Sequence, residues 1–183
     1  MPMRLRQPRP PRHAATTALF AAIAAVAAVV LAWPATSAVS APPRAGLFEP
    51  GRSLGGLRLG MTPGQVRAAW GTNFGRCRGC AATTWYFNYA PFAPEGAGVE
   101  FRRSRVDAIF TLWSPAGWRT RAGLRIGDDE ARVNDLYGGL TRAECGSYRV
   151  LLSPRGRIVS AFSIVSGRVW GFALFRAPSR PCR

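Results

Sequence analysis

The chain contains no lysine, and its only histidine is His13, so the side chains that most often act as catalytic bases are almost missing. Histidine is the commonest general base near neutral pH, and lysine supplies the amine of Schiff-base enzymes. If the first residues are removed from the mature chain, His13 is lost with them, and triads that combine serine or cysteine with histidine are excluded. The sequence therefore disfavours an enzyme, and we expect no cofactor.

Acidic residues are also scarce. The chain has 25 basic residues, all of them arginine, against 9 aspartates and glutamates, and its formal net charge is +16. Such an excess attracts anionic partners, which include lipid headgroups, phosphate-rich polymers and acidic proteins. No homeodomain, zinc-finger or RRM pattern is present, so we expect no nucleic acid partner.

Residues 1–41 have the plan of a secretory signal peptide. Four arginines precede an apolar run from Ala14 to Leu31, and small residues follow the run. This order indicates cleavage after Ala38 or Ala41, and we favour Ala38. The run of about 18 residues is near the shortest that can span a bilayer, so an uncleaved membrane anchor is the alternative. Without residues 1–41, 21 arginines face 9 acidic residues, a net charge of +12.

All four cysteines, Cys77, Cys80, Cys145 and Cys182, follow this segment. An even number of cysteines in an exported chain favours disulfides, and three pairings are possible. We favour Cys77–Cys80 together with Cys145–Cys182, one bridge for each half of the mature chain. The C-x-x-C spacing of the first pair also occurs in thiol–disulfide enzymes, which is the alternative interpretation. We expect no metal site, because a mature chain without histidine has too few ligands at the required spacing.

Residues 55–71 and 122–138 read as two copies of one pattern. Gly60, Val66, Trp70 and Gly71 of the first copy match Gly127, Val133, Tyr137 and Gly138 of the second. Further along, residues 101–106 match residues 164–169 in the same order. Two matches in the same order indicate a duplicated structural unit, and the period is too long for an ordinary solenoid.

Each copy predicts one short helix followed by three antiparallel strands. Thr62 and Gln65 form a capping-box pattern, and Gly71 is a stop signal, so the first helix is expected at 63–70. The second helix is expected at about 129–137. The expected strands are 83–89, 99–102, 106–112, 147–152, 157–165 and 168–175.

These elements predict an α+β fold of two tandem α-β-β-β modules that form one antiparallel sheet with both helices on one face. The other face of this six-stranded sheet is expected to be open or partly covered by loops. The expected organisation is a flexible lead-in at 42–53, module 1 at 54–113, a linker at 114–121, module 2 at 122–176 and a tail at 177–183 that carries Cys182.

The candidate binding residues are aromatic residues and arginines. Side chains alternate along a strand, so Trp85 and Tyr89 point to one face of the sheet and Tyr86 to the other. We expect one set to lie on the open face, near arginines of neighbouring strands, because Trp, Tyr and Arg dominate binding hot spots. The alternative is that these rings fill a small core. The candidates are Tyr86, Trp85, Tyr89, Arg102, Arg149, Trp113 and Trp118.

The pattern Leu59-Gly-Met-Thr62 with Gln65, Val66 and Gly71, followed by Cys77, an aromatic strand and a hairpin, resembles a known fold. It is similar to the tandem-repeat fold of secreted β-lactamase inhibitor proteins and equally to single-repeat outer-membrane assembly lipoproteins. Gly127, Val133 and Gly138 give a weaker second match, and the second helix starts Gly-Asp-Asp-Glu instead of Gly-Met-Thr. The resemblance implies a binding or scaffolding protein, since neither family is an enzyme. In the inhibitor family, the concave sheet face and its loops grip the partner.

Together these features predict a secreted, monomeric binding protein of the cell envelope or extracellular space. It is expected to recognise a protein or an anionic polymer through an aromatic and arginine-lined sheet face. One alternative is an envelope assembly scaffold anchored by an uncleaved N-terminal segment, which would be its only contact with a membrane. The other alternative is a thiol–disulfide enzyme that uses Cys77 and Cys80.

Overall fold

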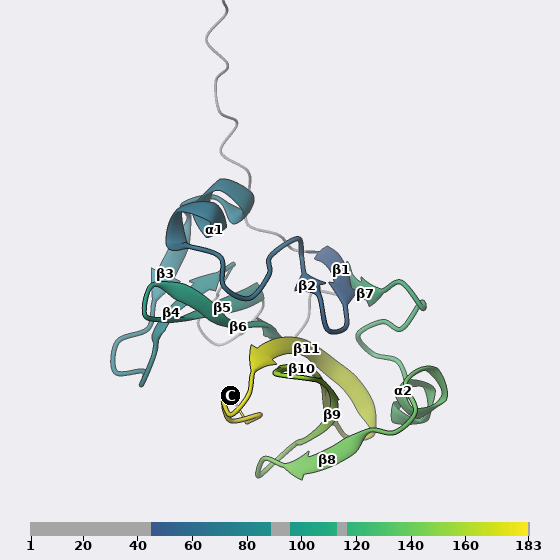
Figure 1. Cartoon of the computed structure of the whole chain (residues 1–183). Helices are drawn as coiled ribbons and strands as arrows, with labels where there is room; N and C mark the ends of the chain where they lie inside the picture. Colours follow the sequence, from purple (N-terminus) through teal and green to yellow (C-terminus); the bar gives the residue numbers. More distant parts are fainter. Residues whose placement is uncertain (1–44, 89–95, 113–116, 183) are drawn as a thin grey trace, which may run out of the picture. The chain divides into compact units, whose positions relative to one another are not determined.

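Antiparallel hairpins dominate the chain and join into one sheet of eight strands (Figure 1). The computed structural model describes residues 45–88, 96–112 and 117–182, all within the unit Ser37–Arg183. In spatial order, the strands are β3 (Phe74–Arg76), β4 (Thr83–Phe87), β5 (Gly96–Arg102), β6 (Arg105–Leu112), β11 (Arg168–Arg176), β10 (Ile158–Val165), β9 (Arg149–Arg155) and β8 (Thr141–Glu144).

The central pairing, β6 with β11, joins two four-stranded halves. Its register contains only three residue pairs: Phe110 with Ala173, Ile109 with Leu174, and Ala108 with Phe175. The neighbouring hairpins are longer, because β5 and β6 pair over 96–102 and 105–112, and β10 and β11 pair over 158–165 and 168–176. The two halves therefore meet along a short seam.

A second, mixed sheet of three strands contains β1 (Ala45–Glu49), β2 (Ser53–Leu54) and β7 (Gly117–Thr120). β1 pairs antiparallel with β2 and parallel with β7, so segments far apart in the sequence lie side by side. Phe48 of β1 stacks on Phe172 of β11, with ring centroids 5.1 Å apart. The small sheet therefore packs against one face of the large sheet.

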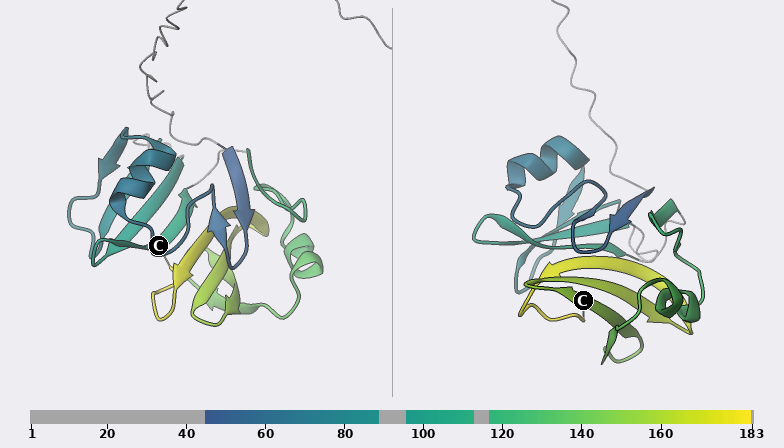
Figure 2. Two further views of the ribbon diagram at one scale, coloured as in Figure 1. Left: turned by 45° about the horizontal axis from the view of Figure 1, so that its top comes forward. Right: turned by 45° about the vertical axis from the view of Figure 1, so that its right-hand side comes forward.

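Helix α1 (Pro63–Trp70) starts at the capping box that the sequence indicates. The Thr62 amide donates to Gln65 Oε1 at 2.8 Å, and the Gln65 amide donates to Thr62 Oγ1 at 3.2 Å. Only Val66 and Trp70 of this helix are buried. The helix lies against the half of the sheet formed by β3–β6 (Figure 2).

Helix α2 (Glu130–Leu136) lies beside the other half and buries only Val133 (Figure 2). Its N-cap residue, Asp129, makes no side-chain capping bond. Neither α1 nor α2 is long and apolar enough to cross a bilayer, and the same holds for every helix among the described residues. The apolar run Ala14–Leu31 lies outside those residues.

The large sheet buries apolar side chains on both faces. A first cluster contains Val66, Trp70 and Val133 of the helices, the small sheet, and strand residues from both halves. A second cluster lies on the opposite face and contains Ala108, Phe110, Val150, Val159, Ala161, Ala173 and Phe175. Alternation along β11 shows the division, since Leu174 belongs to the first cluster and Phe175 to the second.

Our prediction of the fold class, two tandem α-β-β-β modules forming one antiparallel sheet with both helices on one face, is wrong. The structure is mostly β, with an eight-stranded sheet, an additional mixed sheet and two short helices. The extra strands β3 and β8 are too short to show the alternation on which strand prediction depends. β1 and the first residue of β2 lie within the expected lead-in, and β7 lies within the expected linker. The pairing of β1 with β7 is long-range and leaves no local pattern in the sequence.

Candidate functional site

The C-terminal tail, residues 177–182, folds back over the second face of the sheet. Figure 1 shows this end of the chain within the curve of β8–β11. Cys182 forms a disulfide with Cys145, which directly follows β8. At the other end of the tail, Ser179 Oγ donates to Asp107 Oδ2 at 2.9 Å. The tail is therefore fastened at two points and covers part of the second apolar cluster.

A β-bulge positions Asp107 to hold this tail. Glu100 pairs with Ala108 and Phe101 with Val106, so Asp107 is an extra residue without a partner on β5. A bulge re-aims a side chain in this way. Besides Ser179, the carboxylate of Asp107 interacts with Arg102 at 3.6 Å and Arg176 at 3.9 Å.

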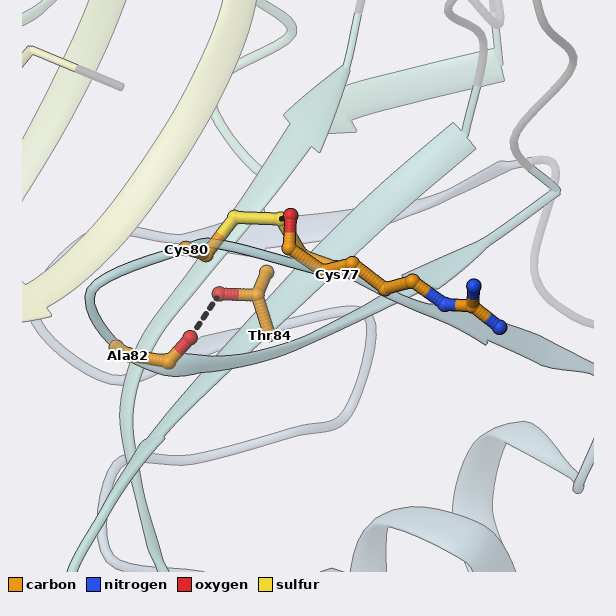
Figure 3. Close-up of a disulfide and its surroundings, with 5 residues drawn as sticks. Cys77, Cys80, Ala82 and Thr84 are labelled. Carbon is orange, nitrogen blue, oxygen red and sulfur yellow. Dashed lines mark hydrogen bonds between the residues drawn. A yellow bond between two sulfur atoms is a disulfide. The ribbon is translucent and has the colours of Figure 1, made fainter.

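The loop between β3 and β4 is fastened by the disulfide Cys77–Cys80 (Figure 3). The Cys77 amide donates to the Thr84 carbonyl at 3.0 Å. Thr84 Oγ1 donates to the Ala82 carbonyl at 3.1 Å, as the dashed line in Figure 3 marks. Both disulfides thus match the pairing that the sequence favoured, and each fixes a segment at the second face.

A groove of about 380 Å³ lies between the 77–82 loop and the tail. Tyr86 of β4 and Phe110 of β6 form its aromatic part, with ring centroids 6.2 Å apart in an edge-to-face arrangement. Gly98 of β5 leaves room for the Phe110 ring, because a Cβ at Gly98 would lie 2.2 Å from Phe110 Cζ. The charged residues of the groove are Glu100, Arg102 and Arg180, and both arginines are exposed.

The structure brings two of the sequence-predicted residues, Tyr86 and Arg102, together in this groove. Trp85 instead packs in the first cluster, where it stacks on Phe74 with ring centroids 3.9 Å apart. Trp118 is fully buried in the same cluster. Its Nε1 has no hydrogen-bond partner among the described residues. Tyr89 and Trp113 lie outside those residues.

Arg149, also expected beside Tyr86, lies on the helix side of the sheet. Its Nε donates to both carboxylate oxygens of Glu130 on α2, at 3.1 and 3.0 Å. These hydrogen bonds raise the pKa of Arg149 above its usual value. An analogous effect occurs at Glu49, whose pKa is lowered by hydrogen bonds from Ser53 and Arg121. Arg149 and Glu49 thus form hydrogen bonds with other residues of the fold, away from the groove.

Sequence reasoning missed Phe110, Glu100 and the tail with Arg180. The one available signal was Cys182, because a disulfide partner must return to the body of the fold. The sequence does not show which face the returning tail crosses, since that depends on the path of residues 177–181 and on the bulge at Asp107.

The surroundings of Cys77 and Cys80 differ from those of thioredoxin-like sites, in which the C-x-x-C pair lies at the start of a helix. Here the pair lies in a loop between two strands, and neither described helix starts there. Among residues 45–88, 96–112 and 117–182, no group of three or more His, Cys, Asp or Glu side chains is placed to hold a metal ion.

No protein-family model matches the chain. No curated protein matches its sequence. Among solved structures, an extracellular SCP-domain protein from Bacillus anthracis str. Ames is similar with a TM-score of 0.47 and 9% identity, over 65% of this chain and 44% of that chain. The chain thus spans less than half the length of that protein.

Two further structures are similar at the same level. The DUF4309 family protein YjgB from Bacillus subtilis has a TM-score of 0.45 and 16% identity, over 63% of this chain and 78% of that chain. The cysteine-rich secretory protein SAV1118 from Staphylococcus aureus Mu50 has a TM-score of 0.45 and 11% identity, over 75% of this chain and 50% of that chain. These similarities are too remote to carry a statement about function.

Proposed function

We propose that the chain is a secreted, non-catalytic protein that binds an anionic polymer of the cell envelope in the groove between the two disulfide-fastened segments. The observation that carries the proposal is the convergence of Tyr86 and Phe110 with Arg102 and Arg180 in one groove. Export is supported by the signal-peptide pattern of residues 1–41 and by the two disulfides, which persist in oxidising compartments.

The groove is suited to binding because its walls are already ordered. The Cys77–Cys80 bridge restrains one wall, and the Cys145–Cys182 bridge with the Ser179–Asp107 hydrogen bond restrains the other. Binding to a preordered site loses less conformational entropy than binding to a flexible one. The edge-to-face rings of Tyr86 and Phe110 add rigid apolar surface beside the arginines.

An anionic ligand is supported by the distribution of ion pairs. Six carboxylates form ion pairs with arginines of the chain itself, and these are Glu49, Asp107, Asp128, Asp129, Glu130 and Glu144. Arg180 has no carboxylate partner among the described residues, and Arg102 shares Asp107 with Arg176. Among the residues that line the groove, Arg102 and Arg180 outnumber the carboxylate of Glu100, so the groove keeps a net positive charge for an external anion.

The double substitution Tyr86→Ala with Arg102→Ala tests the proposal. We expect binding of the purified mature protein to protein-free cell walls to weaken about tenfold, ~1.4 kcal/mol, because an aromatic and a guanidinium contact are lost together. Co-sedimentation at low ionic strength measures this affinity. The far-ultraviolet spectrum and the unfolding midpoint of the variant serve as checks of folding.

Arg132→Ala is the matched control. Like Arg102, Arg132 is an exposed arginine that pairs with an aspartate, here Asp128 at 3.3 Å, but it lies on α2. The control variant is expected to bind like the unchanged protein. Equal loss in both variants would show that net charge alone drives binding, and no loss in the double variant would exclude the groove as the binding site.

A further inference from the structure

One edge of the eight-stranded sheet concentrates exposed arginines. Because neighbouring strands are antiparallel, β5 and β11 end at the edge where β6 and β10 begin. The strand register shows this, since Arg102 pairs with Arg105 and Ile158 pairs with both Arg155 and Arg176. The loop after β3 reaches the same edge. We call the following exposed residues the arginine edge: Arg78, Arg103, Arg105, Arg155, Arg157 and Arg176.

The charge of the arginine edge is largely uncompensated. Within the described part of the chain, Arg176 is the only one of these residues in an ion pair, with Asp107 at 3.9 Å. At the opposite edge, the arginines that begin β9 and β11 are paired, Arg149 with Glu130 and Arg168 with Asp129. The positive potential is therefore strongest along one edge of the sheet.

The edge is extended rather than point-like. Neighbouring strands lie about 4.8 Å apart, so the β3–β4 loop and the β5–β6 turn are roughly 10 Å apart and the β9–β10 turn lies roughly 14 Å further along, with Arg176 at the end of β11 between them. Arg78 lies at the β3–β4 loop, Arg103 and Arg105 at the β5–β6 turn, and Arg155 and Arg157 at the β9–β10 turn. Such a row fits a linear molecule with repeated negative charges better than a single small anion.

The row is continuous with the groove. Arg102 lines the groove and directly precedes Arg103, and Arg180 of the tail also lines it. Resting on the proposed function, we propose that the arginine edge binds the continuation of the polymer held in the groove and that this polymer is a linear phosphodiester chain. Each phosphate of such a chain can accept a bidentate pair of hydrogen bonds from one guanidinium, so its repeated phosphates match a row of arginines.

The composition of the turns disfavours nucleic acid. Residues 77–82, 103–105, 154–157 and 177–182 contain arginine, glycine, serine, alanine, proline and cysteine but no aromatic residue. Proteins that bind single-stranded nucleic acid stack bases on aromatic side chains along the strand. These turns therefore offer contacts for a phosphodiester backbone, and the aromatic rings of Tyr86 and Phe110 lie in the groove rather than along the edge.

The test uses poly(glycerol phosphate) and a short fragment of it, with a variant that carries Arg103→Ala, Arg105→Ala, Arg155→Ala and Arg157→Ala. We expect this edge variant to bind the long polymer about thirtyfold more weakly at low salt and the short fragment unchanged. The slope of log affinity against log salt should fall by about 3, since each lost phosphate contact removes about 0.7. Isothermal titration at several salt concentrations measures both quantities.

A charge-matched control carries Arg119→Ala, Arg125→Ala, Arg132→Ala and Arg168→Ala, all outside the edge, and is expected to keep most of the polymer affinity. Equal loss in the two variants, or no loss in the edge variant, would overturn the role of the edge. Equal affinity for polyglutamate, or tenfold tighter binding of single-stranded DNA, would overturn the phosphodiester assignment. If the unchanged protein and the Tyr86→Ala, Arg102→Ala variant bind the short fragment with equal affinity, the groove is rejected as the binding site.

Discussion

Replacing Cys145 and Cys182 by alanine is expected to lower the free energy of unfolding by several kcal/mol and to release the tail from the second face. The bridge joins residues 37 positions apart. In the chain-entropy treatment, a cross-link closing a loop of this length stabilises by about 4 kcal/mol through the unfolded state. Urea unfolding followed by tryptophan fluorescence measures the change in unfolding free energy.

The release of the tail has a separate readout. Ser179 and Arg180 are expected to become sensitive to proteases in the native state, and the groove should lose ligand affinity because one wall is no longer fixed. Cys77→Ala with Cys80→Ala is the control, since its bridge spans only 3 positions and stabilises by about half as much in the same treatment. If the loss of Cys145–Cys182 lowers the free energy of unfolding no more than the loss of Cys77–Cys80, this account of the tail is contradicted.

Trp70→Ala is expected to destabilise the fold by about 4 kcal/mol, the usual range for removal of a buried large aromatic side chain. Trp70 packs edge-to-face against Phe87 of the large sheet, at 5.2 Å between ring centroids, and against Trp118 of the small sheet, at 6.4 Å. Its Nε1 donates to the Gly55 carbonyl at 2.8 Å. One side chain therefore connects α1, the large sheet and the small sheet.

Trp70→Phe separates packing from hydrogen bonding. This control keeps a ring in the core but loses the bond to Gly55, and it should retain more than half of the stability lost in the alanine variant. Because Trp70 lies on the face opposite the groove, the folded fraction of either variant should bind ligand normally at low temperature. Loss of binding without loss of stability would show that Trp70 acts on the groove directly.

Local signals in the sequence predicted the local structure well. Thr62 and Gln65 form the capping box at the start of α1, and the preferred cysteine pairing is the one in the structure. These features depend on residues a few positions apart, or on a small number of possible pairings. The parallel pairing of β1 with β7 had no such signal, because it joins residues 45–48 to residues 117–120.

The candidate site was predictable only in part, because the face on which a strand residue points depends on register. Tyr86 faces Gly98, which in turn faces Phe110, so these residues share one face. Irregularities opposite Glu100/Phe101 and Ser163/Ile164 interrupt the alternation of β6 and β11, the strands that carry the extra residues. A shift of one residue moves a side chain to the other face. Arg149 pairs with Ile164 in a regular part of the sheet and lies on the helix side.

The short seam between the halves has a consequence for the folding chain. Each half is built from hairpins between nearby segments, whereas the three pairs of the seam join residues of β6 to residues of β11, far later in the sequence. Closing such a long loop is slow compared with forming a hairpin. Until it closes, both β6 and β11 are apolar strands with unpaired backbone groups that can join other molecules, so refolding yield should fall as protein concentration rises.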